Sequence, residues 1–179
     1  MNVIQKLASS LNRRDEVPNQ ELAKQIAGKN DKKAVKELID NLANKSRDIQ
    51  NDCIKVLYEI GERKPALLSP YSKIFVELLD NKNNRLQWGA MTALNTIAPD
   101  RPEAIYRALP KIIESANNGS VITKDYCVNI LLVFVRSKNI PAKPSHCLSN
   151  NYSIALPINC RCMQKNRYRS LMKKIKRCL

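Results

Sequence analysis

The sequence repeats itself with a period of about 37 residues, and this periodicity restricts the fold more than any other feature. One step of this length places Ile49 on Leu86 and Ile54 on Met91. A second step completes four sets of equivalent positions: Cys53, Ala90 and Cys127; Ile54, Met91 and Val128; Leu57, Leu94 and Leu131; Ile60, Ile97 and Phe134. The apolar pattern is thus shared by three copies, which predicts equivalent structural units with a common core.

Within each copy the apolar residues recur every three or four positions, which is typical of an amphipathic helix. Gly is scarce, with 4 residues, and aromatic residues make up only 5%, so a sheet built from many tight turns is disfavoured. Proline, Asn, Asp and Gly separate the apolar segments, and Asp31 is a plausible N-cap. The pattern predicts helices over residues 3–11, 20–27, 33–42, 47–61, 71–79, 85–97, 102–115 and 121–134.

A unit of about 37 to 40 residues that holds two helices resembles the HEAT repeat, because ankyrin and tetratricopeptide units are shorter. The resemblance covers residues 46–135, and residues 1–45 are expected to form capping helices. It implies an all-α fold, namely a right-handed α-solenoid of antiparallel helix pairs. Each unit would pair residues 47–61 with 71–79, or 85–97 with 102–115. In this family, the second helix of each pair mainly lines a concave face that binds partners.

Four residues are candidates for partner binding. Lys73, Arg107 and Lys111 lie on the expected second helices, and Lys73 and Lys111 recur at nearly the repeat spacing. They could form a short basic ladder for an acidic partner or a phosphate backbone, or they could be ordinary solvated lysines. Trp88 is the single tryptophan, and it is either a half-buried packing residue or an anchor for a partner.

The net charge of +15 is unevenly distributed along the chain. Residues 136–179 hold 11 of the 31 Lys and Arg residues and none of the 16 Asp and Glu residues. The other 20 basic residues are nearly balanced by all 16 acids in residues 1–135, so the helical region has too little positive charge to favour nucleic-acid binding. The chain therefore divides into a repeat domain over residues 1–135 and an anomalous, basic and Cys-rich tail over residues 136–179.

The tail is predicted to be a frame-shifted reading of further repeats, because the acids and the apolar period end together near Arg136. If each codon begins one base earlier, the genetic code fixes three residues whatever synonymous codons are used. Asn159 with Cys160 gives leucine, Met163 with Gln164 gives alanine, and Arg167 with Tyr168 gives leucine, isoleucine or valine. These residues lie two repeat lengths beyond Leu86, Ala90 and Leu94, so the repeat pattern returns in the shifted frame.

The sequence offers little for catalysis or metal binding. His146 is the single histidine, and Cys53 and Cys127 lie on the expected core stripe. The carboxylates of Asp48, Asp52 and Glu59 are interpreted as solvated charges. Five residues could supply zinc ligands, but their spacing does not fit a zinc site: His146, Cys147, Cys160, Cys162 and Cys178. No phosphate-binding loop or other catalytic motif is present, so we expect no catalytic, cofactor or metal site.

These observations favour a non-enzymatic scaffold or adaptor that binds a protein partner on its concave face. The longest apolar run, residues 130–135, is far shorter than a membrane span of about 20 residues, which favours a cytoplasmic protein. One alternative is a nucleic-acid-binding protein that resembles the helical-repeat DNA alkylation-repair family. Another is a helical-repeat subunit of a lyase-type enzyme, for which no catalytic residues are evident.

Overall fold

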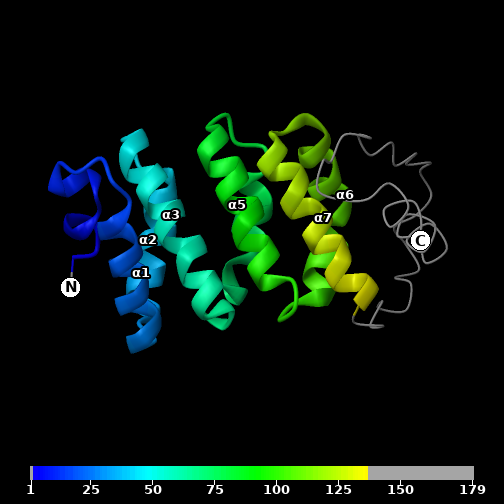
Figure 1. Cartoon of the computed structure of the whole chain (residues 1–179), viewed down its shortest axis with the longest axis horizontal. Helices are drawn as coiled ribbons and strands as arrows, with labels where there is room; N and C mark the ends of the chain where they lie inside the picture. Colours follow the sequence, from blue (N-terminus) through cyan, green and yellow to red (C-terminus); the bar gives the residue numbers. More distant parts are fainter. Residues whose placement is uncertain (1, 137–179) are drawn as a thin grey trace.

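A computed structural model describes residues 2–136, and this region is built from helices and contains no strand. The α-helices are α1 Val17–Lys29, α2 Lys32–Asp40, α3 Arg47–Arg63, α4 Ser72–Leu78, α5 Asn84–Ile97, α6 Pro102–Asn118 and α7 Val121–Arg136 (Figure 1). Short 3₁₀ turns are η1 Ile4–Lys6, η2 Ser9–Leu11, η3 Asn41–Ala43, η4 Pro65–Leu67 and η5 Ser69–Tyr71. The all-α prediction is confirmed for this region, whereas residues 137–179, with most of the predicted frame-shifted tail and all five candidate zinc ligands, lie outside it.

The helix predicted over residues 3–11 is wrong, because this segment forms the two 3₁₀ turns η1 and η2 around an extended Leu7. The reason is that side chains of later helices bind its backbone. The Ala8 amide donates to Oδ1 of Asn19 at 3.0 Å, and the Ser9 amide donates to Oδ2 of Asp52 at 2.8 Å. Amides held by α1 and α3 cannot also complete an α-helical turn.

Side-chain caps fix the starts of three helices. Asp31 accepts hydrogen bonds from the amides of Lys33 and Ala34, so its predicted role as the N-cap of α2 is confirmed. Ser46 caps α3 through the amide of Ile49, and Asn83 caps α5 through the amide of Arg85. These caps fix the residues at which α3 and α5 begin, and both helix starts contribute to the candidate site.

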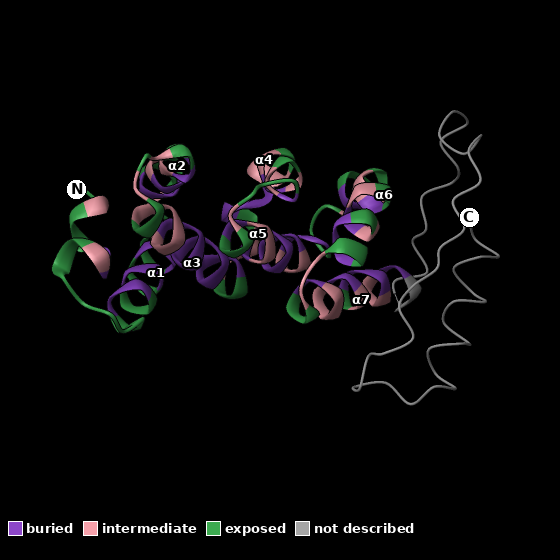
Figure 2. Ribbon diagram, turned by 90° about the horizontal axis from the view of Figure 1, so that it is seen from above, coloured by how far each residue is buried: buried purple, intermediate pink, exposed green. Residues whose placement is uncertain are grey.

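The helices form two layers (Figure 2). One layer contains α1, α3, α5 and α7, in which α3 packs against α1 and α5, and α5 packs against α7. The other layer contains α2, α4 and α6, which lie mainly on α3, α5 and α7 respectively. Each close pair between layers is thus α2 with α3, α4 with α5, or α6 with α7. The predicted pairings of residues 47–61 with 71–79 and of residues 85–97 with 102–115 are wrong, because α4 packs mainly on α5 and α6 packs mainly on α7.

The repeat positions predicted to be equivalent lie in the core. Leu57 and Leu94 are fully buried, and Leu131 is 3% exposed, so their predicted burial is confirmed. Cys53 and Cys127 are buried as well and belong to the same apolar cluster. One continuous core therefore runs along α3, α5 and α7, as expected when no single helix pair can bury its own apolar stripe.

Gly89 allows α3 and α5 to approach each other closely. A Cβ atom at Gly89 would lie 2.5 Å from Cγ1 of Ile54, closer than real side chains come. We therefore expect Gly89→Ala to lower the free energy of unfolding by roughly 1 to 3 kcal/mol, since the buried Ile54 must move. Urea denaturation of the variant and the wild type measures this change.

Gly28→Ala is the matched control for Gly89→Ala. Gly28 also lies in a helix, but a Cβ atom there would meet nothing within 4 Å. Alanine restricts the unfolded chain and favours the helix, so Gly28→Ala should raise the free energy of unfolding by roughly 0.5 to 1 kcal/mol. Equal effects of the two substitutions would contradict close packing of α3 on α5.

Candidate functional site

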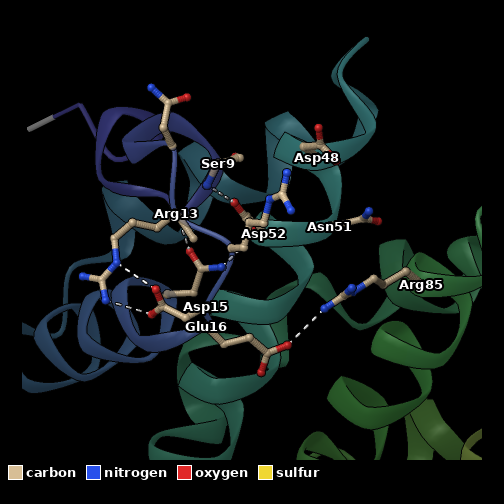
Figure 3. Close-up of a pocket in the computed structure, with 12 residues that line it drawn as sticks. Ser9, Arg13, Asp15, Glu16, Asp48, Asn51, Asp52 and Arg85 are labelled. Carbon is tan, nitrogen blue, oxygen red and sulfur yellow. Dashed lines mark hydrogen bonds and ion pairs between the residues drawn. The ribbon is translucent and has the colours of Figure 1, made fainter.

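A polar pocket of about 520 Å³ lies where residues 8–16 meet the first turns of α1, α3 and α5 (Figure 3). Twelve residues line it: Ala8, Ser9, Asn12, Arg13, Arg14, Asp15, Glu16, Asn19, Asp48, Asn51, Asp52 and Arg85. We call this hollow the N-terminal pocket. All but one of its lining residues carry a polar or charged side chain, so it is suited to polar ligands rather than to an apolar one.

The pocket exists because α1, α3 and α5 begin at the same edge of their layer. Asn83, which caps α5, donates through Nδ2 to Oδ1 of Asn51 at 3.0 Å. In turn, Nδ2 of Asn19 in α1 donates to Oδ1 of Asp52 in α3 at 2.8 Å. The positive ends of three helix dipoles therefore face the same region, which favours carboxylates there.

Asp52 organises the inner wall of the pocket. Its Oδ2 accepts a hydrogen bond from the Ser9 amide, and its Oδ1 accepts one from the Asn19 side chain. The interpretation of Asp52 as a solvated charge was wrong, since this carboxylate joins the N-terminal segment and α1 to α3. The hydroxyl oxygen of Ser9 lies buried beside it and has no hydrogen-bond partner.

The rim of the pocket is held by an ion pair within the segment that precedes α1. Arg13 binds Asp15 through two parallel hydrogen bonds, from Nε at 2.8 Å and from Nη2 at 3.0 Å. Asp15 also accepts a hydrogen bond from the Val17 amide. The hydrogen bond from the Arg13 side chain is the main reason why the pKa of Asp15 lies below its usual value.

Glu16 connects three helices at the floor of the pocket. Its Oε1 binds Nη2 of Arg85 in α5 at 3.0 Å, and its Oε2 binds Nζ of Lys55 in α3 at 2.9 Å. Lys55 also binds Glu59 at 2.9 Å, and Glu59 binds Arg63 at 2.7 Å. The prediction that Glu59 is a solvated charge was wrong, because this carboxylate is buried inside the ion-pair network.

The network keeps Lys55 and Glu59 charged although both are buried. Burial acts to lower the pKa of Lys55, but its interactions with Tyr58, Glu16 and Glu59 outweigh this effect and raise the pKa above the usual value. Burial acts to raise the pKa of Glu59, yet hydrogen bonds from Lys55 and Arg63 lower it overall. A buried pair of this kind is stable only while both partners are present.

Trp88 extends this network along α5. The Lys55 ammonium lies 4.8 Å from the centre of the Tyr58 ring, and that ring lies 5.7 Å from the Trp88 ring with a tilt of 48°. Trp88 is partly buried against the core. Of the two roles proposed for Trp88, packing is thus visible in the structure.

The other three predicted binding residues lie in the second layer. Lys73 on α4 and Arg107 on α6 are exposed, as expected. Lys111 is half-buried and forms an ion pair with Asp80 at 2.6 Å, so its charge is already offset. The basic ladder is therefore weaker than the sequence indicated, and the structure does not bring Trp88 together with these three residues.

Arg14 and Asp48 are the charged lining residues most available to a ligand. Both are exposed, and neither forms an ion pair or side-chain hydrogen bond within residues 2–136. The spacing of four residues between Asp48 and Asp52 puts both on one face of a helix, but it does not indicate a pocket. The segment that supplies Arg13 to Glu16 carries no repeat pattern, so nothing in the sequence indicated its position.

Within the described region, no group of three or more His, Cys, Asp or Glu residues is arranged to hold a metal ion. Burial, the largest cause, raises the pKa of the Cys53 thiol to about 12, so this cysteine stays protonated. None of the helices between residues 2 and 136 is long and apolar enough to cross a membrane. Comparisons with protein-family models, curated proteins and solved structures give no match.

Proposed function

We propose that this protein is a non-enzymatic, cytoplasmic helical-repeat scaffold that binds a protein partner at the N-terminal pocket. The proposal includes the finer fold, a right-handed solenoid of HEAT-like repeats. Two features support that fold: the helices lie in two layers, and the equivalent residues Leu57, Leu94 and Leu131 are buried alike. Repeat proteins of this kind use extended surfaces to bind other proteins.

The observation that carries the proposal is the mixed charge of the pocket. Its lining has three arginines, Arg13, Arg14 and Arg85, against four carboxylates, those of Asp15, Glu16, Asp48 and Asp52. Five of these seven groups are held in place by partners within the protein, while Arg14 and Asp48 remain available. Preorganised groups of both signs match the polar rim of a protein interface, where charge complementarity sets specificity.

The same reasoning argues against nucleic acid as the ligand. A phosphate backbone needs a clear excess of basic residues, and the pocket has one acid more than it has bases. The layer with the predicted basic ladder is no better. On α4, on α6 and in the turn after α4, four acids oppose the three bases Lys73, Arg107 and Lys111, namely Glu77, Asp80, Glu103 and Glu114.

Charge reversal at the two available residues tests the proposal. We expect the variant Arg14→Glu with Asp48→Lys to lose at least about tenfold in affinity for the partner, since each residue would then repel the group it binds. Affinity purification with the wild-type chain identifies the partner, and titration of that purified partner against both forms measures the loss.

Lys24→Glu is the control for this experiment, because Lys24 is exposed on α1 outside the pocket. It should leave the affinity unchanged. Unchanged binding by the double variant would place the partner elsewhere on the protein. Strong binding of duplex DNA by the wild type, weakening steeply between two salt concentrations, would instead support the nucleic-acid alternative.

A further inference from the structure

One flank of α7 is apolar and only partly covered. The repeat register identifies this flank, because each helix of its layer meets the next through equivalent positions. Ile54 of α3 contacts Gly89 of α5 and is fully buried. Met91 holds the same position in α5, which packs against α7, and is also fully buried. Val128 holds this position in α7, and it is only partly buried.

The surface of α7 is more apolar than that of α5. Leu132 and Val133 are half-buried aliphatic residues, and Val121 and Ile122 at its start are 71% and 45% exposed. The residue equivalent to Ile122 in α5 is Arg85, and the one equivalent to Leu132 is Asn95. Apolar residues on a helix surface normally pack against a neighbour, so α7 has more apolar surface than its neighbours among residues 2–136 bury.

We propose that this flank of α7 is the docking face for a further helix pair, encoded by the same gene read one base earlier from about codon 137. The pair would continue the layer of α1, α3, α5 and α7 and would bury Val128, as the equivalent residues Ile54 and Met91 are buried in α3 and α5. This occupant is preferred because the three residues fixed in the shifted frame are leucine, alanine and an aliphatic residue at the required spacing.

The positions that those three residues occupy correspond to Leu86, Ala90 and Leu94, which are all fully buried in α5. The unshifted frame places Cys160, Gln164 and Tyr168 there instead. A glutamine and a tyrosine in place of Ala90 and Leu94 would bring polar atoms and extra volume into a position closed on all sides. The residues encoded in the shifted frame therefore suit a buried position against α7 better than the residues of the unshifted frame do.

The test compares two full-length chains, the 179-residue chain and a chain made from the same gene with one base inserted near codon 137. Val128→Asp is introduced into each. In the frame-corrected chain Val128 should be buried, and the substitution should lower the Tm by roughly 5 to 15 °C. In the unshifted chain Val128 stays only partly buried, and the Tm should fall by less than half as much as in the frame-corrected chain.

Asn129→Asp is the matched control, because Asn129 is the exposed neighbour of Val128 and should tolerate a charge in both chains. Equal effects of Val128→Asp in the two chains would overturn the proposal. A concentration-dependent dimer of the unshifted chain that Val128→Asp dissociates would also overturn it, since a second copy would then cover α7. Peptide mass spectrometry of the protein from its natural source should find shifted-frame peptides, and finding only unshifted peptides would reject the proposal.

Discussion

Leu94→Ala is expected to lower the free energy of unfolding by about 2 to 5 kcal/mol, the range for removing a buried leucine side chain. Leu94 is fully buried in the middle of α5, the helix that packs against α3, α4 and α7. Helices on three sides restrict how far the surroundings can collapse into the cavity. The cost should therefore lie in the upper half of that range.

Urea denaturation followed by circular dichroism measures this effect as a shift in the midpoint. Leu11→Ala is the control, because Leu11 is 49% exposed and its removal should cost less than about 0.5 kcal/mol. Leu57→Ala should resemble Leu94→Ala, since both residues are fully buried at equivalent repeat positions. A cost below about 1 kcal/mol at Leu94 would contradict the shared core that the repeat register describes.

The core could be predicted from the sequence because the buried positions recur with the repeat period. Every helix of the α1, α3, α5 and α7 layer packs apolar residues against its neighbours, so the same apolar pattern occurs once in each repeat. Leu57, Leu94 and Leu131 could be identified as equivalent from that pattern alone, and their burial confirms it. The sequence could not show whether each second-layer helix packs mainly on the helix before it or on the helix after it. A regular alternation of helices is compatible with both arrangements.

The N-terminal pocket could not be predicted because its contacts join residues far apart in the sequence and occur only once. The Ser9 amide binds Asp52, and Glu16 binds Arg85, although no repeat links either pair. These contacts also explain two of the wrong interpretations, those of Asp52 and of residues 3–11. Asp52 was interpreted as solvated, and residues 3–11 were predicted to be helical. In both cases the partners that form the hydrogen bonds lie in other segments of the chain.

The prediction for Lys111 in the second layer was wrong for the same reason, because its partner lies in another segment. Lys111 was predicted to offer a free charge, but Asp80 follows α4 and lies 2.6 Å from its ammonium. Lys73 and Arg107, which have no such neighbour among the ion pairs of residues 2–136, stay exposed as predicted. Charge on a helix surface can be read from sequence, whereas its pairing depends on how neighbouring helices approach.

The second large effect is expected at Lys55, whose side chain is only 9% exposed and lies between Glu16 and Glu59. Lys55→Met should lower the free energy of unfolding at pH 7 by about 3 kcal/mol, because it leaves the buried Glu59 carboxylate without its main partner. Arg63 still binds Glu59, which places the cost at the low end of the range for breaking a buried pair. Chemical denaturation at pH 7 measures the change.

Lys55→Met combined with Glu59→Gln separates loss of charge pairing from loss of packing. The double variant removes both buried charges, so it should recover most of the stability that Lys55→Met loses. If the double variant is as unstable as Lys55→Met alone, the effect comes from packing of the lysine stem and not from the uncompensated carboxylate. A double-mutant cycle with Glu59→Gln gives the coupling energy directly.

The pH dependence of stability provides the independent check. The pKa of Glu59 in the folded protein lies below its ordinary value of 4.5. Its ionised form therefore contributes stability above about pH 4.5, and this contribution is lost as the pH falls through the folded-state pKa. Glu59→Gln should have a shallower loss of stability below about pH 4.5 than the wild type. The pKa of Lys55 is raised instead, so its contribution is complete below about pH 10.5 and is lost only at higher pH. If the wild type and Glu59→Gln lose stability with the same slope as the pH falls, this result would contradict a charged Glu59 in the ion-pair network.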